Sequence, residues 1–112
     1  ETVRDACRGA ACFAMPSWCE GFGLPLLEAM ACGCACVASS TSALPEVGGD
    51  GVRYVDPGDV EGLSAVMREW LEDEVSRETW GHRALKASRR FSWEASASAL
   101  LELYERVAAC AC

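Results

Sequence analysis

Three short apolar runs, each followed by a turn and then a helical pattern, constrain the fold of this chain more than any other feature. The runs occupy residues 10–15, 34–39 and 51–55, and proline, glycine or hydroxyl residues follow each of them. Strands that are apolar on both faces are typical of parallel sheets that helices cover on both sides. We therefore predict an α/β fold with a partial Rossmann-like parallel sheet flanked by helices.

The helices are placed by their periodicity and by residues that favour helix ends. Pro25 fits the first turn of one helix, where no N–H is needed, and Gly33 fits the end of the same helix. Asp59 and Ser92 are the expected N-caps of two later helices. The predicted helices are residues 1–8, 24–32, 60–73, 76–90 and 93–110. The aromatic side chains expected to pack between helices are Trp70, Trp80, Trp93 and Tyr104.

Length and charge exclude several classes of protein. The 112 residues suffice for one small domain or part of a larger one, and 51% of them are hydrophobic. Ten basic residues against 17 acidic ones give a net charge of −7, so nucleic acid is not expected as a partner. The longest uncharged stretch, residues 29–45, is broken by Gly33, hydroxyl residues and Pro45, which argues against a membrane span.

The start of the sequence bears on whether these residues are part of a longer chain. It has no initiating Met and no signal-peptide pattern, and its first residues read as the tail of an amphipathic helix. We therefore expect a piece of a longer chain, located in the cytoplasm.

Eight cysteines raise the question of disulfides and metal. Long aliphatic helical patterns can fold without disulfides, and no paired C-x-x-C motif accompanies the single histidine, His82. Cys32, Cys34 and Cys36 alternate, so in a strand they share one face. We expect small buried hydrophobic residues in a reducing compartment, with no metal site and no cofactor; a cysteine-based metal or redox module is the competing hypothesis.

The chemistry of the chain is concentrated between Glu20 and Glu46, where Glu28 is the single charged residue. A carboxylate buried without a partner costs several kcal/mol, so Glu28 faces solvent, finds a donor or awaits a ligand. Gly21 and Gly23 permit close backbone approach, and the helix that follows offers free N–H groups to an anion. Such a loop at the carboxyl end of a strand suits a polyhydroxylated phosphate ester.

The run PSWCEGFGLPLLEAMA, residues 16–31, followed by Gly33, resembles the signature of the retaining glycosyltransferases of family four, which have the GT-B fold. Further matches follow in the family's order: SALPEV at 42–47, DPGD at 56–59, and FSWE at 91–94 leading to Tyr104. The resemblance covers nearly the whole chain. It implies that residues 1–112 are the C-terminal part of the nucleotide-sugar-binding domain, without the first half of that domain and without the N-terminal acceptor domain.

The resemblance also implies an activity and a site. The activity is metal-independent transfer of a hexosyl-type sugar from a nucleotide diphosphate sugar to an unknown acceptor, with retention of anomeric configuration. Glu20 is the implied catalytic residue, which contacts hydroxyls of the donor sugar, and Glu28 binds the ribose. The backbone expected against the donor sugar and diphosphate belongs to Gly21, Phe22, Gly23 and Leu24.

Departures from the family pattern matter for activity. The family often has Pro-Val where this chain has Ala35 and Cys36, which changes packing and leaves the glutamates untouched. The upstream arginine and lysine that bind the diphosphate in the family do not precede residue 1. We therefore expect this chain alone to be inactive. Any peripheral membrane contact would come through the missing domain.

Besides the cysteine-based module, two alternative functions remain at this point. One is a noncatalytic truncated homologue that binds a nucleotide sugar or a protein through its apolar surface. The other is a sugar phosphorylase, since related GT-B enzymes use phosphate as acceptor. A basic cluster could also touch acidic lipid or substrate, but its spacing favours a solvated helix face near His82. The cluster comprises Arg83, Lys86, Arg89 and Arg90.

Overall fold

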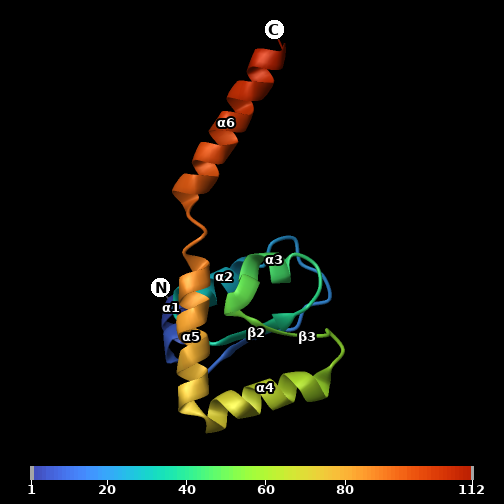
Figure 1. Ribbon diagram of the computed structural model, residues 1–112, viewed down its shortest axis with the longest axis vertical. Coiled ribbons are helices and arrows are strands. Elements are labelled where there is room, and N and C mark those ends of the chain that lie inside the picture. The colour runs from blue at the N-terminus through green and yellow to red at the C-terminus, as the bar shows by residue number, and fades with distance from the viewer. Residues whose placement is uncertain (1, 112) are drawn as a thin grey trace.

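The computed structural model describes residues 2–111 and contains one parallel sheet (Figure 1). The strands are β1 (Phe13–Met15), β2 (Cys36–Ser39) and β3 (Arg53–Val55), in the spatial order β1-β2-β3. Phe13 lies opposite Cys36, and Val37 lies opposite Arg53. The middle strand, β2, is buried along its whole length. The predicted α/β fold with a parallel sheet flanked by helices is confirmed.

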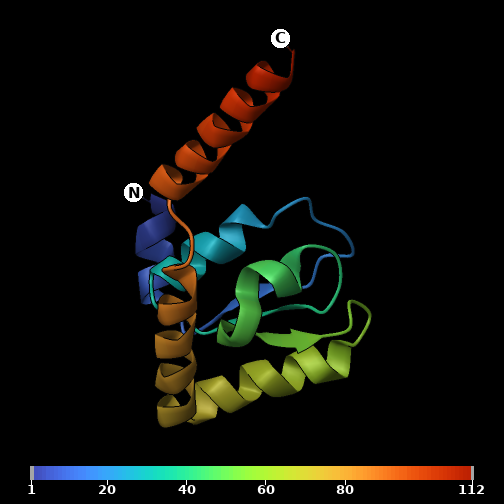
Figure 2. The ribbon, with the colours of Figure 1, turned by 45° about the horizontal axis from the view of Figure 1, so that its top comes forward.

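Helices cover both faces of this sheet (Figure 2). One core lies under α2 and α5 and includes Leu26, Met30 and Cys36. The other lies under α4 and includes Val37 and Trp70. The helices are α1 (Thr2–Gly9), α2 (Leu24–Ala31), α3 (Leu44–Gly48), α4 (Val60–Glu72), α5 (Glu74–Ser88) and α6 (Trp93–Ala111), with a 3-10 turn at Gly49–Gly51.

The three strands are shorter than predicted at their N-terminal ends. The third one was expected to begin at residue 51, but Gly49–Gly51 forms the 3-10 turn that packs on α5. A Cβ on Gly51 would lie 2.7 Å from Cβ of Ala87 and 2.9 Å from the carbonyl oxygen of Arg83. Close packing against a helix therefore takes these residues out of the strand, which sequence periodicity does not reveal.

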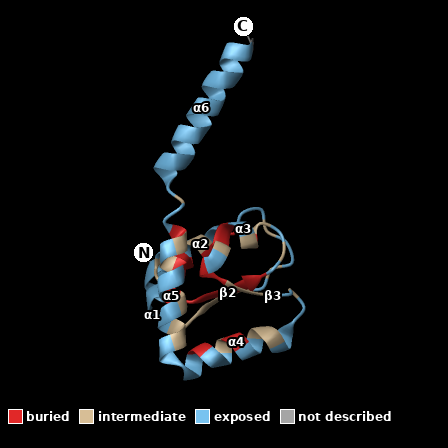
Figure 3. Ribbon diagram, in the orientation of Figure 1, coloured by how far each residue is buried: buried red, intermediate tan, exposed pale blue. Residues whose placement is uncertain are grey.

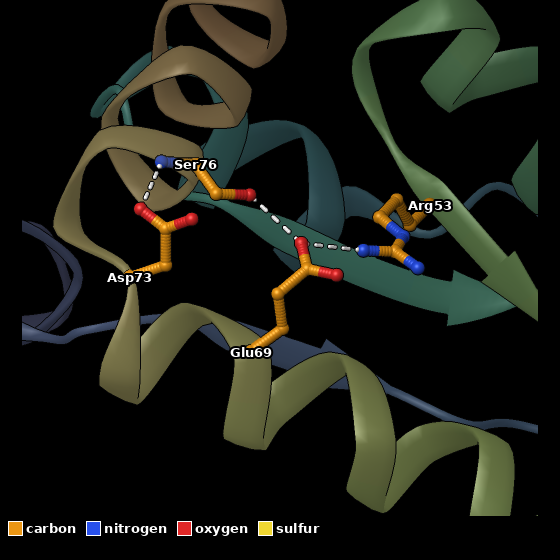
Figure 4. Close-up of polar contacts among 4 residues, drawn as sticks. All are labelled: Arg53, Glu69, Asp73 and Ser76. Atoms are coloured by element: carbon orange, nitrogen blue, oxygen red, sulfur yellow. Dashed lines mark hydrogen bonds and ion pairs between the residues drawn. The ribbon is translucent and has the colours of Figure 1, made fainter.

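The carboxylate of Glu69, on α4, hydrogen-bonds to both α5 and β3 (Figure 4). Glu69 Oε2 accepts hydrogen bonds from Ser76 Oγ at 2.7 Å and from an Arg53 guanidinium N–H at 2.9 Å. These two donors, Ser76 first, lower the pKa of Glu69. Asp73 Oδ1 accepts from the Ser76 N–H at 3.0 Å, and this cap starts α5 at residue 74 rather than at the predicted 76.

The cysteines in β2 and just before it pack as small hydrophobic residues. Cys34 and Cys36 belong to the same core as Cys7, whereas Ala35 and Val37 belong to the opposite core. Cys32 also packs against this core, so the three alternating cysteines share one side, but only Cys36 lies in a strand, because Cys32 caps the end of α2. Burial raises the pKa of the Cys7 thiol, and a hydrogen bond with Cys34 together with burial raises that of Cys36. Both side chains stay protonated at neutral pH, which makes them poor nucleophiles.

Helix α6 extends away from the rest of the chain (Figure 1, Figure 2), and its described side chains are exposed (Figure 3). Ser92 Oγ caps it as predicted, accepting from the Ala95 N–H at 3.0 Å. The prediction that Trp93 and Tyr104 pack between helices is wrong, because they are 80% and 61% exposed. The same prediction holds for Trp70, which is fully buried. Within residues 2–111 no helix combines the length and apolar character that crossing a membrane requires.

Gly81 provides a test of how closely α5 packs on the sheet. A Cβ at this buried position would collide with the carbonyl oxygen of Gly33 at the turn between α2 and β2. Helix propensity alone would make Gly81→Ala stabilising by about 1 kcal/mol. We expect the opposite, a loss of about 1–3 kcal/mol in the free energy of unfolding, because the backbone must move apart.

Urea denaturation of Gly81→Ala, compared with Gly9→Ala, measures this effect. Gly9 is the last residue of α1, and a Cβ there meets nothing within 4 Å. A Gly81→Ala midpoint equal to or above that of the unsubstituted protein would contradict the close packing.

Candidate functional site

The loops that follow the three strands meet at the carboxyl edge of the sheet, where hydroxyl groups connect them. Ser40 Oγ donates to Asp56 Oδ1 at 3.0 Å and so joins the loop after β2 to the loop after β3. Thr41 Oγ1 donates to the carbonyl oxygen of Trp18 at 3.4 Å and joins the loop after β2 to the loop after β1. In open α/β sheets, ligands bind at this edge.

Glu20 lies in the loop after β1 and is held at both its backbone and its side chain. Ser17 Oγ donates to Glu20 Oε1 at 2.9 Å. Ser42 Oγ accepts from the Glu20 N–H at 2.9 Å and donates to the Glu20 carbonyl oxygen at 2.6 Å. In the part of the chain that the structure describes, the other carboxylate oxygen, Oε2, receives no hydrogen bond. The side chain is half-buried, so this oxygen can accept from a ligand.

The glycine loop presents backbone donors ahead of α2. Gly23 takes a left-handed conformation, with φ +90°, and its carbonyl oxygen accepts from the N–H groups of Leu26 and Leu27. The N–H groups of four consecutive residues, before this turn and at its start, find no acceptor among residues 2–111. Together with the positive end of the α2 dipole, such groups favour an anion. These groups belong to Gly21, Phe22, Gly23 and Leu24.

Glu28 lies on the exposed side of α2, so its carboxylate faces solvent although its neighbours in the sequence are apolar. Its carboxylate receives no hydrogen bond from any described residue. It lines a groove of about 440 Å³ that Phe22 and Leu24 also line. The ring of Phe22 meets that of Phe91 edge to face, with centroids 5.8 Å apart. The groove thus joins one carboxylate to the apolar part of the glycine loop.

The structure brings the predicted site residues into two neighbouring groups. Phe22, Leu24 and Glu28 line the groove, whereas Glu20, Gly21 and Gly23 do not. The second group instead lies against the loop after β2, through the hydrogen bonds between Ser42 and Glu20. The continuous segment from residue 20 to residue 28 joins the two groups.

Sequence reasoning missed Ser17, Ser42 and Phe91. Phe91 begins the FSWE match at 91–94, but this match did not connect it to the site. Ser42 had one, because it closes a run of three hydroxyl residues directly after a buried strand. Hydroxyl groups at the carboxyl edge of a parallel sheet are placed to contact neighbouring loops or a ligand.

Two residues of the basic cluster that was predicted to be a solvated face contact neighbouring groups instead. An Arg90 N–H donates to the carbonyl oxygen of Val47 at 2.8 Å, which satisfies the C-terminal end of α3. The Arg83 guanidinium lies 4.1 Å from the centroid of the Trp80 ring. These two cations therefore stabilise neighbouring elements.

A parallel sheet with helices on both faces and a glycine loop after its first strand defines an α/β domain of Rossmann type. The chain belongs to the glycosyl transferases group 1 family, whose model matches residues 1–87. It is similar to the sucrose-phosphate synthase of Thermosynechococcus elongatus, with a TM-score of 0.82 and 31% identity over 90% of this chain and 26% of that one. This similarity supports the expected GT-B fold.

Two curated relatives are mannosyltransferases. O-antigen chain mannosyltransferase B of Escherichia coli is 43% identical over 93 residues, which are 83% of this chain and 24% of that protein. MMP alpha-(1->4)-mannosyltransferase of Mycolicibacterium hassiacum is 43% identical over 104 residues, covering 86% of this chain and 25% of that protein. The chain thus spans about a quarter of the length of these relatives.

The two glycines of the loop give a matched test of its conformation. In Gly23→Ala a side chain must adopt φ +90°, and its Cβ would lie 2.6 Å from Cδ2 of Leu44. We expect a loss of about 1–2 kcal/mol in the free energy of unfolding, mainly from the left-handed backbone. Gly21→Ala is the control, because a Cβ there meets nothing within 4 Å. Equal denaturation midpoints for the two variants would contradict this assignment.

Proposed function

We propose that this chain is the C-terminal part of the donor-binding domain of a retaining, metal-independent glycosyltransferase that uses a nucleotide diphosphate sugar. The observation that carries the proposal is the arrangement around the glycine loop. Four unpaired N–H groups lie between two carboxylates that each have a free oxygen. Membership of the glycosyltransferase family supports the reaction class, and the mannosyltransferase names of two relatives support a hexosyl donor.

Each part of the donor has a counterpart in the site. Hydroxyl groups of the sugar would donate to Oε2 of Glu20, since Ser17 already occupies Oε1. The free N–H groups from Gly21 to Leu24 would bind the diphosphate. The ribose hydroxyls would donate to Glu28, whose carboxylate faces the groove.

The same groups can assist the departure of the nucleotide. Negative charge grows on the diphosphate as the bond to the sugar breaks, and fixed backbone donors stabilise charge that develops in a transition state. In this proposal the N–H groups and the α2 dipole do at the diphosphate what a metal ion does in other transferases. Glu20, held by Ser17 and Ser42, keeps the sugar in position while this happens.

We propose further that the reaction takes place in the cytoplasm and that the 112 residues do not catalyse it alone. Within residues 2–111 no lysine or arginine hydrogen-bonds to the glycine loop, so the donor would be held on one side only. The acceptor would bind to parts of the protein that its relatives have beyond the matched quarter.

A noncatalytic binding module is the second candidate, and the exposed apolar side chains of α6 favour it. Leu101 and Val107 are 58% and 57% exposed. A binding module would form a stable complex through these side chains while converting no donor. Light scattering of the chain at increasing concentration, combined with a donor-turnover assay of the complete protein, separates the two functions.

Glu28→Gln tests the proposed ribose contact in the complete transferase. Loss of a charged hydrogen bond is worth about 1.5–3 kcal/mol, so we expect kcat/KM for the donor to fall by roughly 10- to 150-fold. The fold should be unaffected, because no described group contacts this carboxylate by a hydrogen bond.

Glu72→Gln, at the exposed last residue of α4, is the matched control for removal of one negative charge. Turnover is measured with UDP-glucose and with GDP-mannose as probes. Unchanged kcat/KM in Glu28→Gln with the donor that the unsubstituted enzyme uses would overturn the assignment of Glu28.

A further inference from the structure

Ser42 adopts a backbone conformation that serine rarely takes. Its φ is 63°, and within residues 2–111 it is the only non-glycine residue with a positive φ. A left-handed conformation costs a residue with a Cβ about 1–2 kcal/mol, whereas glycine adopts it freely. A glycine at this position would avoid the cost, so the serine hydroxyl must serve a purpose that offsets the strain.

The hydroxyl of Ser42 contacts both sides of one residue in another loop. It accepts from the N–H of Glu20 at 2.9 Å and donates to the carbonyl oxygen of Glu20 at 2.6 Å. The two residues are 22 positions apart. A hydroxyl is suited to this double contact, because it has one donor and two acceptor sites.

These hydrogen bonds fix two successive peptide planes. The N–H belongs to the peptide between Cys19 and Glu20, and the carbonyl belongs to the peptide between Glu20 and Gly21. Since a peptide unit is planar and trans, fixing the carbonyl of Glu20 also fixes the direction of the Gly21 N–H. One side chain thereby orients both the Glu20 side chain, through its Cα, and the first free donor of the glycine loop.

The loop that contains Glu20 has few other restraints. Among the described residues, backbone hydrogen bonds outside regular elements involve this loop only at the carbonyl of Gly23, which accepts from α2. Ser42 Oγ also has a longer contact with Cys19 Sγ, at 3.8 Å. Apart from the hydrogen bonds of Ser42, this loop accepts from Ser17 at the Glu20 carboxylate and from Thr41 at the Trp18 carbonyl. Without Ser42, the peptides on either side of Glu20 would be free to rotate.

We infer that Ser42 is a positioning residue for the transfer reaction, which acts by holding Glu20 and the Gly21 N–H toward the donor. This inference rests on the proposed function, because it needs Glu20 to contact the donor sugar. It assigns the strained serine a role in the donor site.

Ser42→Gly in the complete transferase tests the inference without endangering the fold. Glycine adopts the left-handed backbone without strain, so stability is retained while the hydroxyl is lost. We expect kcat/KM for the donor to fall roughly tenfold, the equivalent of one lost hydrogen bond of about 1.4 kcal/mol, chiefly in kcat. Thr79→Ala, which removes an exposed hydroxyl that donates to the Val75 carbonyl oxygen within α5 and lies outside the candidate site, should leave kcat/KM within about twofold.

A double substitution separates positioning from a merely structural role. If Ser42 acts through Glu20, then Ser42→Gly causes a smaller loss in a Glu20→Gln background than in the unsubstituted enzyme, because only its effect on the Gly21 N–H remains. Independent, multiplicative losses in the double variant would overturn the inference. So would unchanged kcat/KM in Ser42→Gly. A fully active Glu20→Gln enzyme would instead overturn the proposed function, and the two failures are thus distinguishable.

Discussion

Burial of β2 on both faces is the constraint on which the rest of the structure depends. The four residues of this strand are buried between two cores, so its backbone must find all its hydrogen bonds in neighbouring strands. Both neighbours run parallel to it, which brings the three following loops to one edge of the sheet. The candidate site is a consequence of this arrangement, because Glu20, the glycine loop and Ser42 come from the loops after β1 and β2, and Glu28 lies on the helix that follows the first of these loops.

Hydroxyl groups fix the geometry of these neighbouring loops relative to one another. Three consecutive residues, from Ser40 to Ser42, hydrogen-bond to two different loops, so the loop after β2 holds the other two in place. The apolar cores position the strands, but they cannot orient a peptide plane in a loop. Short polar side chains can, since each hydrogen bond specifies both a distance and a direction.

Most helices and strands could be predicted from the sequence. Elements that pack on either side of the buried strand β2 repeat apolar residues on the side that faces it, and this periodicity is visible in the sequence. The sequence also located Glu20, Gly21, Gly23 and Glu28 in one segment, because carboxylates and glycines are rare in an otherwise apolar stretch. It did not assign Ser42 to the site, because a run of hydroxyl residues does not show which residue, here one 22 positions away, each hydroxyl contacts. It also misplaced Trp93, because an amphipathic helix has the same pattern whether or not a partner covers its apolar side.

The open site carries polar groups that the fold itself does not satisfy. Glu28 stands in an apolar helix without a hydrogen-bond donor, and the N–H groups of the glycine loop have no acceptor among residues 2–111. Such groups add nothing to stability, but exposure to water keeps the cost small at Glu28 and at every residue of the glycine loop except Gly23, which is buried. Because Gly23 and Ser42 already fix the backbone in strained or left-handed conformations, a ligand need not order it on binding. Its polar groups would then replace water at donors and acceptors that already point in the required directions, which is how a preorganised site gains affinity.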